Sequence, residues 1–401
     1  MRLKRPLADS GPLAALLTPW GQGGIAIIEL TGPDVLSLLA SLCRADSRDR
    51  VRSIRPNQLR YARLVQDGEP LDEVVVECAA RKPFQRLLVN CHGGLVSARR
   101  ILDTLAAKGA REVSADELLA LHHRLGRLNT VQCEAARLIP SAPTLLAARA
   151  LITQYLDALP AALQHIAEQV ERGEKSPPAE AIEALIATSV WGRALCHPPR
   201  IVIAGRPNVG KSTLLNALLR YERVIVHDEP GTTRDAVEER MAIEGVPFRV
   251  MDTAGIRDAT GAVEQEGVAR GRYELAHADL AVLLFDGSQP MTPEDELVFA
   301  SPRPARALVA INKCDQPLQL DVAALARRAP SDPIRISART ETGLPELERR
   351  ILDTMWPHRP APDAPILFTD RQERLAREAL RALTEQNPDA ARACLDRIVN
   401  G

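Results

Sequence analysis

The sequence lacks the features of membrane and secreted proteins. No apolar run in its 401 residues approaches the ~18 residues that a membrane-spanning helix needs. The amino terminus is basic, but its longest apolar stretch, Leu13 to Leu17, is shorter than the about 7–15 residues of a signal-peptide core. We therefore expect a cytoplasmic protein without membrane contact.

The seven cysteines form no recognisable pattern, because none makes a Cys-x-x-Cys pair and their number is odd. Neither a zinc site nor a disulfide framework is expected. The net charge of −1 argues against a strongly basic nucleic-acid coat or an acidic tail. Lysine is scarce as well: only six of the 51 basic residues are lysine, and two of these, Lys211 and Lys313, lie in the motifs below. This placement indicates that lysine itself is needed there.

The first part of the chain predicts a mixed domain followed by helices. Short β-branched stretches predict strands at 23–30, 71–79 and 86–91. The stretch 99–110 predicts an amphipathic helix. From 115 to 192 the pattern is helical, and it opens at Ser114 with Glu117 three residues later, which is typical of a capping box.

From residue 200 onward, apolar strands alternate with helical segments. The predicted strands lie in RIVIAG, RVMDTAG, LAVLLFDG, ALVAINK and PIRIS. This alternation predicts a doubly wound parallel sheet up to about residue 355. A proline-rich stretch, 356–365, predicts a linker, and a last helical region begins at Thr369.

The strongest motif is GRPNVGKS, which fits the phosphate-binding pattern G-x-x-x-x-G-K-[ST]. A predicted strand precedes it and a predicted helix follows it, so loop N–H groups and the helix N-terminus can hold phosphates. Lys211 would reach the β- and γ-phosphates, and the Ser212 hydroxyl would bind Mg²⁺. The residues expected to contact the nucleotide are Gly205, Asn208, Val209, Gly210, Lys211, Ser212 and Thr213.

Three further motifs follow in order, each after a predicted strand. Asp252 can hold Mg²⁺ through water, and the Gly255 N–H can contact the γ-phosphate. In the N-K-C-D sequence Asn312–Asp315, the Asp315 carboxylate can accept both N–H donors of guanine, a pair that adenine lacks. Together the motifs predict a GTPase, and a P-loop ATPase with a chance N-K-x-D is the alternative. The last base-contacting loop is expected at Ser337, Ala338 and Arg339.

A first switch is expected at GTTRD, residues 231–235, between the phosphate loop and Asp252. Thr233 there can ligate Mg²⁺ while the γ-phosphate is present and release it after hydrolysis. The alternative is a surface turn.

These motifs, with the aliphatic residue after D-T-A-G, resemble the MnmE (TrmE) family of bacterial tRNA modification GTPases. The stretches LLTPWGQGGIAIIELTGPD, CHGG and LNTVQCEAARLI resemble its N-terminal landmarks. The resemblance implies an α/β multidomain protein: an α+β, folate-binding-like N-terminal domain that forms a homodimer, a discontinuous helical domain, and an inserted P-loop GTPase domain with a doubly wound sheet. The expected boundaries are 1–112 for the N-terminal domain, 198–356 for the GTPase domain, and 113–197 with 357–401 for the two parts of the helical domain.

The resemblance also implies how the GTPase works. Many GTPases carry a glutamine after D-x-x-G to orient the attacking water, but Ile256 stands there and cannot hydrogen-bond. The family points to Glu264 for this role, whereas the residues alone would make it a solvated helix residue. No arginine is an obvious finger, and the family implies K⁺ instead, which would offset developing charge. Its expected ligands are Asn208, Thr232 and the switch backbone at His227 and Glu229.

The folate-binding part departs from the family. Glu29 replaces a basic residue, Arg127 replaces a lysine, and the stretch 82–90 lacks the family's acidic loop. Family chains end in C-I-G-K, while Cys394 lies inside a predicted helix, where we expect it to pack. We expect weak or absent binding of 5-formyltetrahydrofolate, because an anion at Glu29 would repel the folate carboxylates.

Two functions stay open at this point. The first is a GTPase that acts in tRNA wobble-uridine modification, binding GTP, GDP and tRNA and working with an FAD-dependent partner. The second is a divergent regulatory or assembly GTPase with an RNA, ribosome or protein partner, which has lost folate and tRNA modification chemistry.

Overall fold

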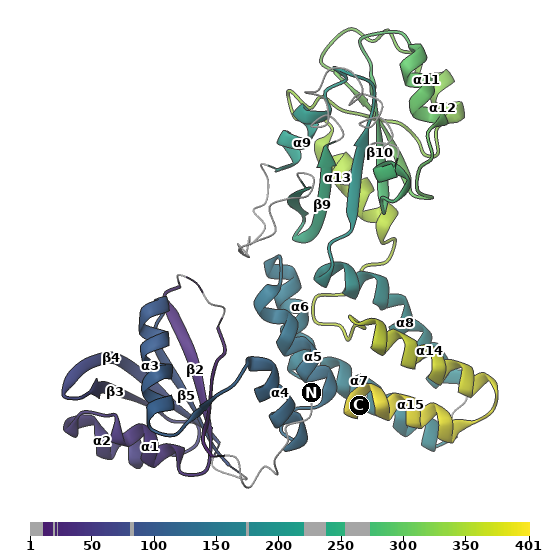
Figure 1. Cartoon of the computed structure of the whole chain (residues 1–401). Helices are drawn as coiled ribbons and strands as arrows, with labels where there is room; N and C mark the ends of the chain where they lie inside the picture. The colour runs from purple at the N-terminus through teal and green to yellow at the C-terminus, as the bar shows by residue number, and fades with distance from the viewer. Residues whose placement is uncertain are drawn as a thin grey trace. The chain divides into compact units, whose positions relative to one another are not determined.

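The computed structural model describes residues 11–18, 21, 23–80, 84–173, 176–219, 238–252 and 273–401. The chain divides into two compact units, Met1–Cys133 and Glu134–Gly401 (Figure 1). Across the described ranges, no helix has the length and apolarity needed to span a membrane.

The first unit contains a six-stranded sheet in the order β3-β4-β5-β2-β1-β6. Neighbouring strands are antiparallel, except that β1 and β6 are parallel. The expected strands at 23–30, 71–79 and 86–91 are confirmed as β2, β4 and β5. The strands are β1 (Leu13–Leu16), β2 (Ile25–Gly32), β3 (Leu59–Gln66), β4 (Glu69–Ala80), β5 (Gln85–His92) and β6 (Arg111–Glu112).

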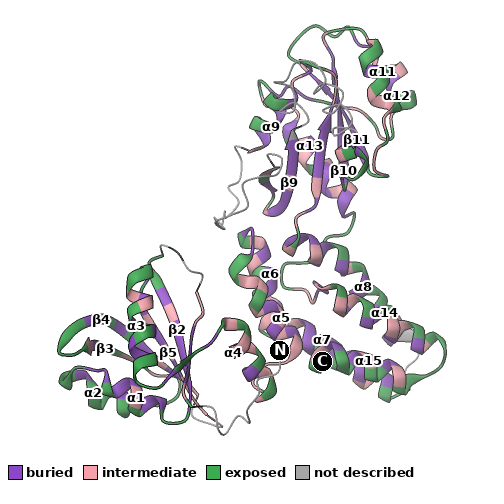
Figure 2. Cartoon of the chain, viewed as in Figure 1, coloured by how far each residue is buried: buried purple, intermediate pink, exposed green. Residues whose placement is uncertain are grey.

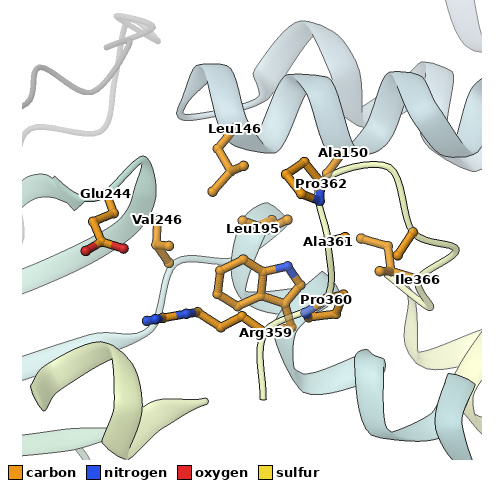
Figure 3. Close-up of a pocket in the computed structure, with 12 residues that line it drawn as sticks. Leu146, Ala150, Leu195, Glu244, Val246, Arg359, Pro360, Ala361, Pro362 and Ile366 are labelled. Atoms are coloured by element: carbon orange, nitrogen blue, oxygen red, sulfur yellow. The ribbon is translucent and has the colours of Figure 1, made fainter. Parts of the chain in front are cut away.

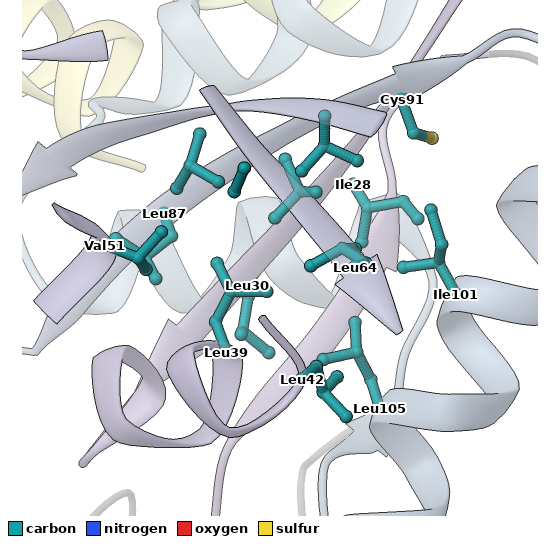
Figure 4. Packing of buried hydrophobic residues seen from close by; sticks show 14 of the residues in the cluster. Ile28, Leu30, Leu39, Leu42, Val51, Leu64, Leu87, Cys91, Ile101 and Leu105 are labelled. Atoms are coloured by element: carbon teal, nitrogen blue, oxygen red, sulfur yellow. The ribbon is translucent and has the colours of Figure 1, made fainter. Parts of the chain in front are cut away.

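Three helices cover one face of this sheet: α1 (Val35–Ser41), α2 (Ala45–Arg52) and α3 (Leu95–Ala107). Alternate strand residues point toward them, such as Ile28 and Leu30 of β2, and meet Ile101 and Leu105 of α3 in one buried cluster (Figure 4). Each such aliphatic side chain contributes roughly 1.5–3 kcal/mol on burial. Figure 2 shows the burial of each described residue, and six of the eight residues of β2 are buried.

A fourth helix, α4 (Ala115–Arg124), packs against β1 through a separate small cluster that includes Leu13, Leu118 and Leu121. The predicted capping box is confirmed, since the Ser114 side chain accepts from the Glu117 N–H and the Glu117 carboxylate accepts from the Ser114 N–H. This helix brings His122 to the far side of β2 from the main core.

The second unit contains a helical part and an α/β part with its own sheet. Helices from two distant stretches pack together: α14 lies against α8 and α15 against α7. Arg371 at the start of α14 makes a bidentate ion pair with Glu134 of α5, at 2.6 and 3.0 Å. The helices are α5 (Thr130–Leu138), α6 (Leu145–Tyr155), α7 (Ala158–Glu171), α8 (Ser176–Cys196), α14 (Asp370–Thr384) and α15 (Pro388–Asn400).

The helical prediction holds with one correction. The pattern suggested uninterrupted helix through residue 157, but α6 and α7 are separated there, and Asp157 has φ of 111°. Pro160 explains the break, because proline fits the first turn of a helix and not its interior. The predicted start at Thr369 is confirmed, since its side chain accepts from the Gln372 N–H, and Cys394 lies half-buried in α15.

The α/β part has a six-stranded sheet in the order β12-β11-β10-β7-β9-β8. Five strands run parallel, as expected, and all seven residues of β10 are buried, as for a strand covered on both faces. The strands are β7 (Arg200–Ala204), β8 (Glu238–Ile243), β9 (Val246–Asp252), β10 (Leu280–Asp286), β11 (Ala307–Asn312) and β12 (Ile334–Arg335). The helices named here are α9 (Lys211–Leu219), α11 (Pro293–Ala300), α12 (Val322–Arg328) and α13 (Leu344–Met355).

The sixth strand, β8, was not expected and makes the sheet mixed. It pairs antiparallel with β9 through the turn Glu244–Gly245, whose φ values of 49° and 79° suit a tight hairpin. This turn approaches α6, since a Cβ on Gly245 would lie 3.1 Å from the Leu146 Cβ.

A cavity of about 170 Å³ lies beside this turn, between α6, α8 and the proline-rich segment (Figure 3). Close by, Trp356 packs edge-on against Trp191 and tilted against Phe248, with ring centroids 5.1 and 5.8 Å apart. The expected linker is therefore anchored at its beginning by buried aromatic contacts.

Candidate nucleotide-binding site

The predicted motif residues meet at one edge of the second sheet. In the parallel register Ile203 of β7 pairs with Asp252 of β9, and Asp286 of β10 pairs with Asn312 of β11. The carboxyl ends of these strands therefore lie side by side, which is where open α/β sheets bind ligands.

The phosphate loop, residues 205–210, connects β7 to α9 and contains two residues with positive φ. Asn208 and Gly210 have φ of 59° and 101°. A side chain at Gly210 would come within 2.3 Å of the Asn312 Nδ2, and one at Gly205 within 2.5 Å of the Leu284 carbonyl oxygen. Glycine is thus required at both ends of the loop by close approach of neighbouring groups.

Lys211 is buried at the start of α9, and its ammonium closes back on the loop. The Nζ atom donates to the carbonyl oxygens of Gly205 and Arg206, at 3.0 and 2.9 Å. Ser212 and Thr213 are exposed in the same first turn. A cation, a hydroxyl and a helix N-terminus therefore lie together, which suits a phosphate–Mg²⁺ group.

The side chain of Asn312 joins the phosphate loop to the segment Ser337–Arg339, where the last base-contacting loop was expected. It is buried, its Nδ2 donates to the Val209 carbonyl oxygen at 2.8 Å, and its Oδ1 accepts from the Ala338 N–H at 2.9 Å. Asn312 was expected at the nucleotide, and here its amide holds the two loops in register.

Asp315 and Ser337, both expected near the base, are joined by a hydrogen bond. The Ser337 hydroxyl donates to the Asp315 Oδ1 at 2.6 Å. This hydrogen bond is the main reason that the pKa of Asp315 lies below its usual range, and Arg339 adds to the effect. The carboxylate is therefore held in its ionised form, which can accept hydrogen bonds.

Lys313, which was expected among the nucleotide-binding residues, engages a buried acid with its ammonium group. Its backbone has φ of 65°, and its Nζ donates to the buried carboxylate of Asp286 at 2.7 Å. No sequence motif marked Asp286, because a carboxylate at a strand end has no local signal for a partner 27 residues away.

Several predicted site residues lie outside the described residues. Asp252 is placed only as the end of β9, next to β7. The others outside this part of the chain are His227, Glu229, Thr232, Thr233, Gly255, Ile256 and Glu264.

The first unit corrects the electrostatic prediction about Glu29. Its side chain is 1% exposed, and the carboxylate contacts Arg86 Nη2 at 2.9 Å and His122 Nε2 at 2.6 Å. Burial raises the pKa of Glu29, but the contacts with His122 and Arg86 outweigh burial and hold the pKa below its usual value. Because the charge of Glu29 is compensated within the protein, the expected repulsion between Glu29 and the folate carboxylates does not hold. Arg127, the other family position, donates to the Phe84 carbonyl oxygen at 2.6 Å.

Comparisons with known proteins agree with this architecture. The family model described as "50S ribosome-binding GTPase" matches residues 200–313, and the one described as "GTP-binding protein TrmE N-terminus" matches residues 12–118. The tRNA modification GTPase MnmE of Chloroflexus aurantiacus is 39% identical over 76% of this chain and 73% of its own. The MnmE proteins of Geobacillus kaustophilus and Alkaliphilus metalliredigens are 34% and 31% identical, over 87% and 93% of this chain and 83% and 88% of their own.

Proposed function

The chain belongs to the MnmE family of GTPases, and on that premise we propose that its GTP hydrolysis serves the modification of wobble uridines in tRNA. The observation that carries the proposal is the presence, in one chain, of the TrmE N-terminal part at 12–118 and the GTPase part at 200–313.

The test is mass spectrometry of wobble nucleosides in tRNA from a strain that lacks this gene and any other member of the family. We expect the modified uridines to disappear and to return with the wild-type gene. Lys211→Ala should fail to restore them, whereas Lys108→Ala, at an exposed lysine after α3, should restore them fully. Unchanged uridines in the deletion strain would contradict the proposal.

For GTP binding, we propose that the phosphates lie over the phosphate loop and the first turn of α9. Lys211 would turn from its two carbonyl acceptors to the β- and γ-phosphates. The Ser212 hydroxyl, Thr233 and water on Asp252 would hold Mg²⁺, which these oxygen donors suit. Bound Mg²⁺ would neutralise charge on the phosphates. Asp315 would select guanine, with Ser337 and Arg339 beside it.

For hydrolysis, we propose that Glu264 orients the attacking water, because Ile256 cannot. K⁺ would be held by Asn208, whose side chain is exposed and whose backbone is left-handed, with φ of 59°. Thr232 and the backbone at His227 and Glu229 would complete the ion's ligands. The positive charge would take the place of an arginine finger.

A second candidate function is a regulatory or assembly GTPase without folate chemistry. The observation that favours it is the buried Glu29, which already engages Arg86 and His122. Cations bound by an internal carboxylate are less able to bind the carboxylates of a folate. Calorimetry with 5-formyltetrahydrofolate distinguishes the two: tight binding favours the tRNA modification role, and absence of binding together with unchanged wobble uridines favours the second.

We also propose the remaining family properties for this chain. These are domain limits at 1–112, 113–197, 198–356 and 357–401, a homodimer through the N-terminal domain, an FAD-dependent partner and a cytoplasmic location. Size-exclusion chromatography with light scattering tests the dimer, and a mass near that of one 43.7 kDa chain would contradict it.

A further inference from the structure

Asp286 is a buried carboxylate that ends β10, in the middle of the nucleotide-binding edge. Its side chain is 2% exposed, although aspartate is rarely buried unless it is paired. The strand before it pairs with β7 as far as Leu283 opposite Ala204, and Asp286 itself pairs with Asn312 of β11. The carboxylate therefore lies between the strand that leads into the phosphate loop and the strand that leads into Lys313–Asp315, called the guanine loop here on the premise of its proposed role in reading the base.

Both neighbouring loops send a cation to this carboxylate. From the guanine loop, the Lys313 Nζ lies 2.7 Å from Oδ2. From the phosphate loop, the Arg206 Nη2 lies 3.4 Å from the same oxygen. The other oxygen, Oδ1, accepts from the Ser288 N–H and hydroxyl, at 3.0 and 2.6 Å. All these groups are donors or cations, so they stabilise the ionised carboxylate, and its charge is compensated within the protein.

Arg206 is itself held firmly, which makes the connection rigid. Its Nη2 donates to the Gln289 Oε1 at 2.7 Å, and its Nε lies 3.4 Å from the carboxylate of Asp295 in the first turn of α11. Its main-chain carbonyl oxygen accepts from Lys211, the residue expected at the phosphates. The side chain of Arg206 thus fixes the backbone that receives the phosphate-binding lysine.

We propose that Asp286 is a positioning residue for guanine-nucleotide binding, which couples the phosphate loop to the guanine loop through Arg206 and Lys313. Without its charge, two buried or half-buried cations lose their common acceptor and repel each other. The guanine loop then loses the anchor of Lys313, whose backbone is strained at φ 65°. Both the affinity for GDP and the discrimination between GTP and ATP depend on this carboxylate.

The experiment uses the purified full-length chain and fluorescent GDP and GTP analogues, with ATP as competitor. Asp286→Asn keeps the shape and removes the charge. We expect its GDP affinity to fall about 10–100-fold, mainly through faster dissociation, because losses of this kind act on the off-rate. The GTP-over-ATP ratio should fall as well, while turnover at saturating GTP changes little.

Asp295→Asn is the matched control, because Asp295 is also a buried acid at 3.4 Å from Arg206 but has no contact with Lys313 among the described residues. It loosens Arg206 alone, so it should lower stability and weaken GDP binding less than Asp286→Asn does, and it should leave the GTP-over-ATP ratio unchanged because Lys313 keeps its acceptor. If it reduces that ratio as much as Asp286→Asn does, the role of Asp286 is merely structural and the proposal is overturned.

A double-mutant cycle keeps the test decisive even if Asp286→Asn folds poorly. Arg206→Gln and Lys313→Gln are combined, and GDP dissociation constants are measured for all four proteins. Because the two side chains share one oxygen of Asp286, their effects should be non-additive by about fivefold or more. Additive effects, or an Asp286→Asn protein that binds GDP within about twofold of wild type, would refute the coupling.

Discussion

Gly210→Ala should separate the local strain of the phosphate loop from its connection to the guanine loop. Gly210 has φ of 101°, where any other residue costs roughly 1–2 kcal/mol. In addition, the new Cβ would lie 2.3 Å from the Asn312 Nδ2, so that amide must move. Its hydrogen bond to the Val209 carbonyl oxygen would break, which costs about 1–3 kcal/mol for a buried group left unpaired.

The two costs sum to about 2–5 kcal/mol. Nucleotide binding must overcome this sum, because it requires the native conformation of the loop. We therefore expect the GDP affinity of Gly210→Ala to fall by about 10²-fold, the equivalent of roughly 3 kcal/mol. The assay is titration and stopped-flow dissociation of a fluorescent GDP analogue, combined with thermal unfolding without nucleotide.

Gly109→Ala supplies the control for backbone strain alone. Gly109 has nearly the same φ, 96°, but a Cβ there would meet nothing within 4 Å, and it lies in the first unit. It should lower thermal stability and leave GDP affinity within about twofold of wild type. If Gly210→Ala binds GDP as tightly as Gly109→Ala, the close contact with Asn312 does not position the loop and the reasoning is refuted.

Four other predictions follow from the two sites. The wild type should prefer GTP over ATP by at least ~10²-fold, and Asp315→Asn should shift preference to xanthosine triphosphate; equal binding of ATP and GTP would exclude base reading by this residue. Ser337→Ala should raise the pKa of Asp315, because the hydrogen bond that lowers it is lost, so GDP affinity should begin to fall at a higher pH on acidification; an unmoved acid limb would contradict this. Hydrolysis should be faster in K⁺ than in Na⁺, and Asn208→Ala should remove the difference; equal rates in the two salts would count against the K⁺ role. Glu264→Ala should slow turnover and leave GTP binding intact, and unchanged turnover would count against the role of Glu264. Calorimetry should show weak or no binding of 5-formyltetrahydrofolate, improved by Glu29→Gln, which releases the engaged guanidinium and imidazole; a micromolar dissociation constant for the wild type would reverse this prediction.

The parts predictable from sequence were those with local signals. The phosphate loop is contiguous and needs glycine at fixed positions, so Gly205 and Gly210 marked it directly. The buried strand β10 was equally clear, as a continuous apolar run. In contrast, β8 begins with Glu238, Glu239 and Arg240, and only its pairing with β9 makes it a strand. Its formation depends on a partner strand and not on its own composition.

Contacts between distant residues could not be read from the sequence. Glu29 and His122 are 93 residues apart, and the strand and helix that bring them together have no shared motif. The packing of α4 on β1 brings His122 to Glu29, and the neighbouring strand β5 supplies Arg86. The same holds for Asp286, which ends a strand as many aspartates do and reveals its role only through Arg206 and Lys313.

The use of lysine at two positions of the nucleotide-binding edge has a physical explanation. An ammonium is a compact point charge, and Lys211 uses it to reach two carbonyl oxygens of a tight loop, while Lys313 uses it to reach one oxygen of Asp286. A guanidinium is planar, larger and fixed in its donor directions, so it suits the position of Arg206, which spreads its donors between Asp286 and Gln289. Lysine in place of Arg206 would lose one of these two acceptors, and arginine in place of Lys211 or Lys313 would be too large for the space that the ammonium fills. A compact ammonium therefore suits both Lys211 and Lys313, in a chain that carries most of its positive charge on arginine.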